Sequence, residues 1–130
     1  MDIDGAVAVL TDTFNRWDMD VFVAICDPEV ELRPLRGMLE EIEYRGHEGL
    51  REFKRDAEAT WAELEFQPAG VESRGEEAVV DGFMRLRGRA SGALTERAVA
   101  MELRMRDGLL WRIAIHPDPD SARRALGWQS

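Results

Sequence analysis

The spacing of apolar residues changes once along this chain, and that change limits the folds that the chain can form. Over most of the first 61 residues, apolar side chains recur every three or four positions, which is the period of an amphipathic helix. From Glu63 onward they alternate with polar side chains, which is the period of a β-strand. Helices followed by strands predict an α+β domain, in which the helices cover one face of an antiparallel sheet.

The first half of the sequence predicts three helices and one strand. A helix is expected over about residues 1–17, a shorter one over 18–26 that Pro28 ends, and a strand over 30–35. A third helix is expected over 47–61. The apolar face of the first helix would carry Ile3, Val7, Leu10, Phe14 and Trp17. The apolar face of the third helix would carry Leu50, Phe53, Ala57 and Trp61.

The second half predicts four strands, over residues 63–75, 77–91, 95–108 and 109–117, and a last short helix over 118–128. Alternation assigns one apolar face to the sheet, with Val80, Met84, Leu86, Val99, Met101, Leu103, Met105, Trp111, Ile113 and Ile115. The opposite face, which is wet or forms an interface, would carry Asp81, Arg85, Arg87, Glu96, Glu102, Arg104, Arg106, Arg112 and His116.

Composition and charge exclude several kinds of partner. The chain has 26 acidic and 17 basic residues, a net charge of −9 and a pI near 4.7. Such a balance disfavours nucleic acids and anionic membrane surfaces, which bind clustered cations. No apolar run approaches the ~20 residues of a membrane span, and "MDIDGAVAVL" lacks the basic start of a signal peptide. We therefore expect a cytoplasmic protein without nucleic-acid or membrane partners, folded as a single domain over residues 1–130.

Cysteine and histidine, the usual ligands of zinc and transition metals, are scarce. Cys26 is the only cysteine, and the two histidines, His47 and His116, lie far apart in the sequence. Neither a structural zinc site nor a site of two histidines and one carboxylate is indicated by this set. We therefore predict no metal and no cofactor.

Four stretches carry a family resemblance when they are taken in order: "FNRWDMDVFVAICDPEVELRPL", "YRGHEGLREFKRD", "RGRASGALTERAVAMELRMRDGLLWRI" and "DPDSARRALGW". Together they resemble the SnoaL-like branch of the nuclear-transport-factor-2-like superfamily. The resemblance implies a cone-shaped barrel, in which a strongly curved sheet wraps around the N-terminal helices and leaves a pocket at one end. It also implies a homodimer that packs sheet against sheet. One departure is Trp17, where relatives usually carry a glycine, and its indole would cap or narrow the pocket.

The superfamily includes polyketide cyclases, ketosteroid isomerases and epoxide hydrolases, so the fold alone does not give a function. The isomerase mechanism needs a carboxylate base, a protonated acid and a tyrosine. The positions that align with these groups hold Arg33, Met101 and Leu10. None of these side chains can do that chemistry, and we expect the isomerase mechanism to be absent.

The resemblance implies that an epoxide hydrolase of this fold would use an Asp–Arg–Asp arrangement of side chains. In this chain, only Asp81 with Arg85 or Arg87 could contribute to one from the strands. Alternation places these residues outside the pocket unless a bulge at Gly82 changes the face. We favour a charged stripe that faces solvent or a dimer partner.

Arg33, Tyr44 and His116 are the catalytic candidates that remain. In a cavity, Arg33 would bind a substrate carboxylate or an enolate oxygen. At a strand edge it would pair with an acid such as Glu31 or Glu41, and we favour this pairing. Tyr44 could place its hydroxyl at the mouth of the cavity, and the nearby His47 is expected to be exposed at a helix start.

The segment "IHPDPD" places His116 close to Asp118. The two could form an acid/base pair, but Pro119 favours an extended Asp118 that caps the following helix, with Asp120 in its first turn. We favour the cap. Alternation then places His116 on the outer face, toward solvent or a dimer partner.

The residues expected to line a ligand pocket are Phe14, Trp17, Trp61, Met101, Leu103, Trp111, Ile113 and Ile115. The sequence thus predicts a SnoaL-like protein of unassigned activity that binds a small hydrophobic molecule in a pocket lined by aromatic residues and methionine. One alternative is a cyclase, isomerase or hydrolase that acts on a polycyclic or carbonyl-bearing hydrophobic substrate. A second alternative is a dimerisation or interaction module without catalysis, if Trp17 and Trp61 fill the cavity.

Overall fold

The computed structural model of the chain describes residues 1–35 and 43–128. The helices are α1 (Ile3–Arg16), α2 (Met19–Ala24), α3 (Gly46–Thr60) and α4 (Pro119–Ala125). The strands are β1 (Cys26–Arg33), β2 (Tyr44–Arg45), β3 (Trp61–Arg74), β4 (Glu77–Gly88), β5 (Leu94–Arg106) and β6 (Leu109–His116). The predicted α+β class and the order of helices before long strands are confirmed.

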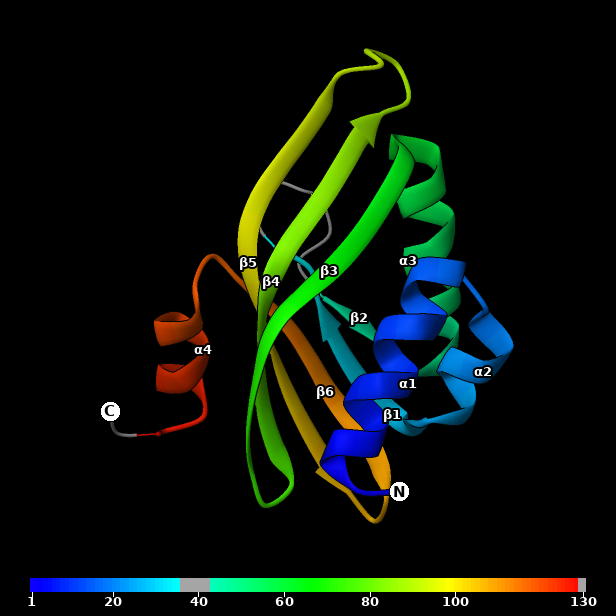
Figure 1. Cartoon of the computed structure of the whole chain (residues 1–130). Coiled ribbons are helices and arrows are strands. Elements are labelled where there is room, and N and C mark those ends of the chain that lie inside the picture. The colour runs from blue at the N-terminus through cyan, green and yellow to red at the C-terminus, as the bar shows by residue number, and fades with distance from the viewer. Residues whose placement is uncertain (36–42, 129–130) are drawn as a thin grey trace.

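The strands form one six-stranded sheet in the order β2-β1-β6-β5-β4-β3. The sheet is strongly curved, and helices α1, α2 and α3 lie on one side of it while α4 lies on the other (Figure 1). It is not closed, because β2 and β3 are its two edges, so the expected barrel is corrected to an open, curved sheet. The expectation of an antiparallel sheet holds for every pair except β1 and β6, which run parallel. The chain between these two strands includes α3 and the four strands β2, β3, β4 and β5, which is long enough for such a crossover.

The face of the sheet toward α1, α2 and α3, called the inner face below, holds the main hydrophobic core. The predicted apolar residues of β4 and β5 lie on it and are buried: Val80, Met84, Leu86, Val99, Met101, Leu103 and Met105. Burial of each large side chain of this kind stabilises the fold by about 1.5–3 kcal/mol. On the outer face, a smaller cluster joins α4 to the sheet through Val79, Ala100 and Ala122.

Three element boundaries differ from those expected. Strand β1 begins at Cys26 and runs through Pro28, because α2 ends at Ala24, before the proline that was expected to end it. Strand β2, a two-residue edge strand, lies in a segment that was expected to be a loop. Trp61 is the first residue of β3 and not the last of α3, because its backbone is extended (φ −120°, ψ 130°).

Helix α1 is fixed to the edge strand β3 by one side-chain amide. The Asn15 Nδ2 group donates to the carbonyl oxygen of Phe66 at 2.9 Å, and the Phe66 N–H donates to Asn15 Oδ1 at 2.9 Å. The amide thereby satisfies both backbone groups of Phe66 that face away from the sheet.

A bulge in β3 brings its backbone very close to β4. The register between these strands shifts between Pro68 and Gly70, and Gly82 of β4 lies opposite Pro68. A Cβ atom at position 82 would overlap the carbonyl oxygen of Gln67 and lie 2.9 Å from Phe66 Cζ. Gly82 is therefore required for this close approach. The bulge does not change the face of the β4 residues.

We predict that Gly82→Ala destabilises the protein, whereas Gly70→Ala does not. The added methyl group at position 82 must displace a strand backbone, and such overpacking costs about 1–3 kcal/mol. At position 70 the Cβ atom would meet nothing within 4 Å. Urea denaturation of the two variants measures the difference in the free energy of unfolding, and equal stabilities would contradict the role given to Gly82.

Candidate functional site

An aromatic cluster fills the space between the helices and the inner face. The ring of Phe14 lies 5.4 Å from that of Trp17 and 6.5 Å from that of Phe53. The Trp17 and Phe53 rings are 6.1 Å apart, and Tyr44 meets Phe53 edge to face at 5.5 Å. Aromatic pairs at these distances add about 0.5–1.5 kcal/mol each beyond the area that they bury.

Trp17 has an unusual backbone. It follows the last residue of α1 and lies in the left-handed region, with φ 57° and ψ 33°, where its N–H donates to the carbonyl oxygens of Thr13 and Phe14. Glycine suits this position best, and a bulky residue there costs about 1–2 kcal/mol. The strain is compensated by the packing of the indole against Phe14 and Phe53.

A small cavity lies inside this cluster and is called the aromatic cavity. Its volume is about 10 Å³, which holds one water molecule at most. The aromatic cavity is lined by Thr13, Phe14, Trp17, Met19, Phe22, Leu50 and Phe53. It is too small for an organic ligand unless one of these side chains moves.

A much larger open groove lies on the other side of Trp17, between the end of α1, the end of α3 and the start of β3. This tryptophan groove has a volume of about 480 Å³. It is lined by Asn15, Arg16, Trp17, Lys54, Ala57, Glu58, Trp61, Ala62, Glu63, Leu64, Glu65 and Arg89. Trp17 contributes to both spaces and therefore forms the wall between them.

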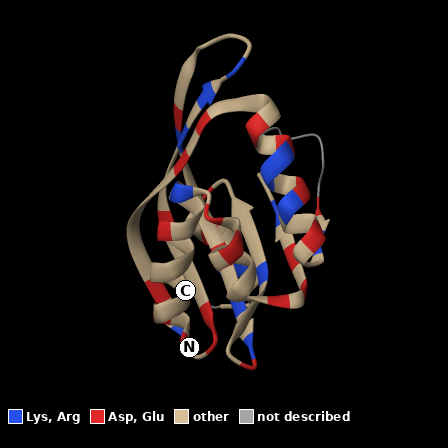
Figure 2. Ribbon diagram, turned by 90° about the vertical axis from the view of Figure 1, so that its right-hand side faces the viewer, with Lys and Arg blue, Asp and Glu red and all other residues tan. Residues whose placement is uncertain are grey.

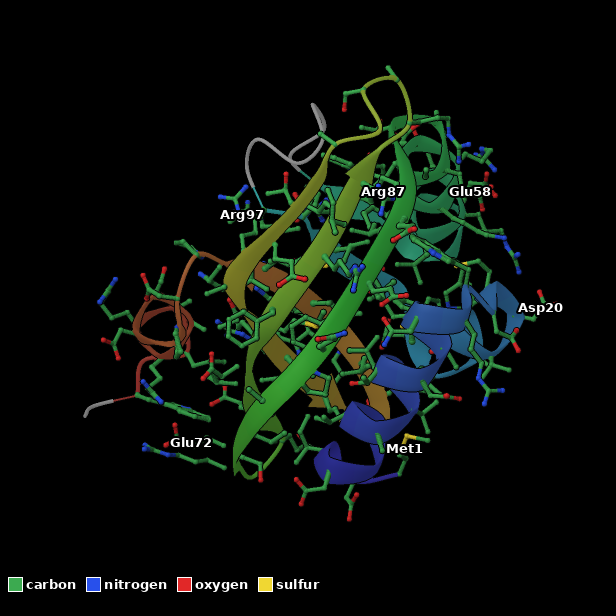
Figure 3. The ribbon with its side chains drawn as sticks, turned by 45° about the horizontal axis from the view of Figure 1, so that its top comes forward. Met1, Asp20, Glu58, Glu72, Arg87 and Arg97 are labelled. Carbon is green, nitrogen blue, oxygen red and sulfur yellow. The ribbon has the colours of Figure 1, made fainter. Side chains whose placement is uncertain are left out.

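The rim of the tryptophan groove carries charges of both signs. Lys54 pairs with Glu58 at 3.3 Å, and Glu63 pairs with Arg87 at 3.2 Å. Figure 3 labels Glu58 and Arg87 at this end of the molecule, and Figure 2 shows acidic and basic residues mixed along α3. Within the groove, Trp61 Nε1 is buried without a hydrogen-bond partner among the described residues. An unsatisfied donor of this kind costs about 1–3 kcal/mol.

Seven of the eight predicted pocket residues fall into three places, and Trp111 lies elsewhere. Phe14 and Trp17 line the aromatic cavity, and Trp17 and Trp61 line the tryptophan groove. Four others are buried in the inner-face core and line neither space: Met101, Leu103, Ile113 and Ile115. Their place on the inner face agrees with the alternation, but no described cavity reaches them.

Trp111 does not lie on the inner face with Ile113, where alternation placed it. Its ring lies under the guanidinium groups of Arg104 and Arg106, at 5.7 Å and 5.0 Å from the ring centre. The physical reason is a register shift between Arg104 and Met105 of β5, which pairs Met105 with Leu110 and leaves Trp111 as the extra residue of β6. Leu110 takes the buried position instead.

Two of the three catalytic candidates, Arg33 and Tyr44, have acidic partners. Arg33 lies exposed on the outer face and approaches Glu43 at 3.8 Å, so it pairs with an acid as favoured, although with a different one from those proposed. Of the two acids proposed, Glu31 binds Arg112, and position 41 lies outside the described residues. Tyr44 is buried on the inner side, and its hydroxyl donates to Asp56 Oδ2 at 2.7 Å.

His47 is half-buried and not exposed as expected. Its Nε2 atom lies 2.8 Å from the carbonyl oxygen of Cys26, so the ring ties the first turn of α3 to β1. The thiol of Cys26 is buried, which raises its pKa to about 12. A thiol with such a pKa is not a nucleophile at neutral pH.

The polar centre of the outer face is a buried carboxylate that the sequence did not single out. Glu102 of β5 has no exposed surface. Its Oε2 atom accepts from Arg104 Nε at 2.7 Å and from Arg112 Nε at 2.8 Å, and its Oε1 atom lies 2.9 Å from His116 Nε2. Glu102, Arg104, Arg112 and His116 form what we call the Glu102 cluster. Arg112 extends it to β1, where it donates to Glu31 at 3.0 Å.

The charge of Glu102 is set by these partners. Burial alone would raise the pKa of the carboxyl group, but the hydrogen bonds from His116, Arg104 and Arg112 outweigh it and lower the pKa to about 2. Glu102 is therefore a carboxylate at neutral pH, and its charge is matched by the two arginines.

The segment after β6 folds as Pro119 predicted, with Asp118 as the cap of the following helix. Asp118 is the N-cap of α4, and its Oδ1 atom accepts from the Ser121 N–H at 2.7 Å. His116 lies on the outer face, as expected, but it contacts Glu102 and Ser121 and not Asp118.

The possible epoxide hydrolase residues also lie on the outer face, where Arg87 is bound to Glu63 and Arg85 approaches it at 3.9 Å.

Two further properties concern metals and membranes. In residues 1–35 and 43–128, no three His, Cys, Asp or Glu side chains gather so that they could hold a metal ion. Within the same residues, no helix is long and apolar enough to cross a membrane.

We predict that Glu102→Gln lowers the free energy of unfolding at pH 7 by about 3 kcal/mol, because two half-buried arginines lose their fully buried carboxylate partner. Since the folded-state pKa of Glu102 is lowered, its contribution is present above pH 4.5 and is lost as the pH falls toward 2. Urea denaturation across this range should show the two proteins converging at low pH. The exposed Glu65→Gln variant is the control and should follow the wild type, and a pH-independent gap between Glu102→Gln and the wild type would contradict the prediction.

Comparison with known proteins agrees with this architecture. The family model of the SnoaL-like domain matches residues 7–113. Among solved structures, a nuclear-transport-factor-2-like protein of unknown function from Burkholderia pseudomallei superposes with a TM-score of 0.81 at 23% identity, over 95% of this chain and 96% of that one. A putative polyketide cyclase from Pseudomonas putida gives 0.78 at 14% identity, over 92% and 94%. TerC, co-crystallised with polyporic acid, gives 0.79 at 20% identity, over 95% and 96%.

At these identities the structural neighbours show the fold alone. No curated protein matches the chain in sequence. The match to the family model, which covers more than half of the chain, places the chain in the family of SnoaL-like domain proteins, and its fold is that of the nuclear-transport-factor-2-like structure from Burkholderia pseudomallei.

Proposed function

We propose that this protein binds a small, flat hydrophobic molecule in the tryptophan groove, against the indoles of Trp17 and Trp61. The observation that carries the proposal is the strained backbone of Trp17. A residue held in the left-handed region at the wall of a groove is maintained against a local cost, and such strain is concentrated at functional sites.

The size and lining of the groove support a small organic ligand. A volume of about 480 Å³ falls within the range of small-molecule sites, about 300–1,000 Å³. Two indoles offer flat apolar surface at low cost in side-chain entropy, and the charged rim would leave polar substituents of the ligand in contact with water. The nearby aromatic cavity gives the Trp17 ring space for small movements.

One structural neighbour supports the same class of ligand. TerC was co-crystallised with polyporic acid, which indicates that a protein with this fold can hold an organic acid. The proposed site in this chain is argued from its own two tryptophans.

The enzymatic alternative has less support. Tyr44 lies on the inner side of the sheet, and Arg33 and His116 lie on the outer face, so the three candidates do not converge on one substrate. A cyclase, isomerase or hydrolase built on the inner side would depend on Tyr44 and Asp56, which are joined at 2.7 Å.

We predict that the protein binds 2-naphthol and that Trp17→Ala and Trp61→Ala each weaken this binding about 10-fold, by the loss of one stacking surface. Isothermal titration calorimetry measures the affinities. Trp128→Ala is the matched control, because Trp128 packs against the outer-face cluster. Trp17→Gly should bind as weakly as Trp17→Ala but be more stable by about 1 kcal/mol, because glycine removes the backbone strain.

Absence of binding by the wild type, or equal losses in all three alanine variants, would contradict the proposed site. The comparison of Trp17→Gly with Trp17→Ala separates the role of the indole from that of the backbone, since both variants lack the ring.

A homodimer through the outer face is a second proposal, and two exposed apolar side chains favour it. Phe83 of β4 is 50% exposed, and Leu94 of β5 is 42% exposed. Register places both on the outer face, because Phe83 lies opposite Ala98 and Arg87 lies opposite Leu94. A pair of apolar side chains among charged neighbours is typical of the centre of an interface.

We predict that Phe83→Glu raises the dissociation constant of the dimer at least about 10-fold, because a charge would enter the centre of the interface. Val71, also 50% exposed but on the edge strand β3, provides the control variant Val71→Glu, which should leave the dimer intact. Sedimentation velocity over a concentration series measures both. A monomeric wild type, or equal dissociation in the two variants, would exclude this interface.

A further inference from the structure

The outer face contains a chain of hydrogen bonds that no predicted function uses. His116 Nε2 lies 2.9 Å from Glu102 Oε1, and His116 Nδ1 lies 3.1 Å from Ser121 Oγ. The three side chains come from β5, β6 and the first turn of α4. A carboxylate, an imidazole and a hydroxyl in series are the components that activate a serine for nucleophilic attack.

The direction of each hydrogen bond follows from Glu102. An ionised carboxylate can only accept, so the proton between Glu102 and His116 belongs to His116 Nε2. In a neutral imidazole, the other nitrogen then has a lone pair. Nδ1 therefore accepts from the hydroxyl of Ser121, which is the direction in which a general base removes a proton.

The surroundings hold the chain in this arrangement. Arg104 and Arg112 both bind Oε2 of Glu102, which leaves Oε1 for His116. Arg104 also donates to the carbonyl oxygen of Ala125 in α4 at 2.8 Å, and thereby fixes the helix that carries Ser121. Ser121 is half-buried as a residue, so it is not enclosed in the core.

We propose that Ser121 is a nucleophile that accepts acyl groups from small activated esters, with His116 as its general base and Glu102 as the residue that positions His116. Ser121 Oγ forms a bond to the acyl carbon while the bond from that carbon to the leaving aryloxide breaks. The hydroxyl proton passes to His116 Nδ1 and then to the aryloxide, which leaves as a phenol. Water then attacks the acyl carbon while His116 takes its proton, the bond from Ser121 Oγ to that carbon breaks, His116 returns the proton to Oγ, and the acyl group leaves as the carboxylic acid.

The charges around His116 make the reaction depend on pH. Glu102 faces it from β5, and Arg104 and Arg112 bind the other oxygen of the same carboxylate, while the segment that carries Ser121 also contains Asp118, Asp120 and Arg123. Two more charged residues lie further from His116. Glu31 of β1 binds Arg112. Asp81 of β4 pairs with Ala100 of β5, and Ala100 pairs with His116. A protonated His116 cannot accept the serine proton. The rate of acetylation should therefore fall when His116 is protonated.

The test is acetylation by p-nitrophenyl acetate, with the modified residues identified by peptide mass spectrometry. Ser121 should be acetylated at least about 10²-fold faster than Ser91, an exposed serine whose Oγ accepts only a local backbone N–H. This ratio is measured within the wild-type protein and does not depend on the folding of any variant. Acetyl groups on His116 itself, or equal rates at the two serines, would overturn the proposal.

Variants separate activation from a purely structural role of the same contacts. Ser121→Ala should abolish the release of p-nitrophenol that exceeds the background, whereas Ser91→Ala should not. His116→Gln should reduce acetylation of Ser121 to the rate of Ser91 and remove its pH dependence, with folding checked by circular dichroism. If His116→Gln is folded and Ser121 still reacts at the wild-type rate, the contacts serve only to attach α4 to the sheet.

Discussion

The burial of one carboxylate organises the outer half of this molecule. Glu102 has no exposed surface, and an isolated charge in that position would cost many times the stability of a small domain. The cost is removed by partners on both sides: Arg104 on the same strand, and Arg112 and His116 on β6. These partners reach further, to Glu31 of β1 and to the end of α4. A single buried charge thus fixes the relation of three strands and places a helix on the face opposite the main core. Figure 3 shows Glu72 near that helix, where its ion pair with Arg123 adds a further contact.

On the inner side, the corresponding constraint is steric. Trp17 takes a backbone conformation that favours glycine, and it keeps it because its indole completes the cluster with Phe14 and Phe53. The same indole divides the space around it into a closed cavity and an open groove. A glycine at this position would remove both the strain and the wall.

The sequence predicted what depends on local pattern and missed what depends on register and distant pairing. Alternation identified the inner face of β4 and β5, and Pro119 identified the Asp118 cap, since the cap and the N–H that it binds are three residues apart. Trp111 was placed on the wrong face because a bulge adds one residue without changing the apolar pattern around it. The Glu102 cluster was missed because its members meet only through the register of β5 with β6, and its extension from Arg112 to Glu31, 81 positions apart, depends on the pairing of β1 with β6. The local sign was a charged residue, Glu102, within the otherwise apolar run 98–103 of β5.

The hydrogen-bonded series of Glu102, His116 and Ser121 lies on the opposite side of the sheet from the aromatic cavity and the tryptophan groove. This arrangement limits the reactions that the molecule can catalyse. Among the described residues, Thr13 and Glu102 are the only buried polar or charged ones outside the hydrophobic core, and the Thr13 hydroxyl already donates to the carbonyl oxygen of Val9. For proton transfer next to a substrate, the inner side offers the pair of Tyr44 and Asp56, and the rim of the tryptophan groove offers Lys54, Glu58 and Glu63. The acid, base and hydroxyl that lie in series are on the other face, where the sheet separates them from the tryptophan groove. A ligand in the groove and an acyl group on Ser121 would thus occupy independent sites, so neither proposal depends on the other.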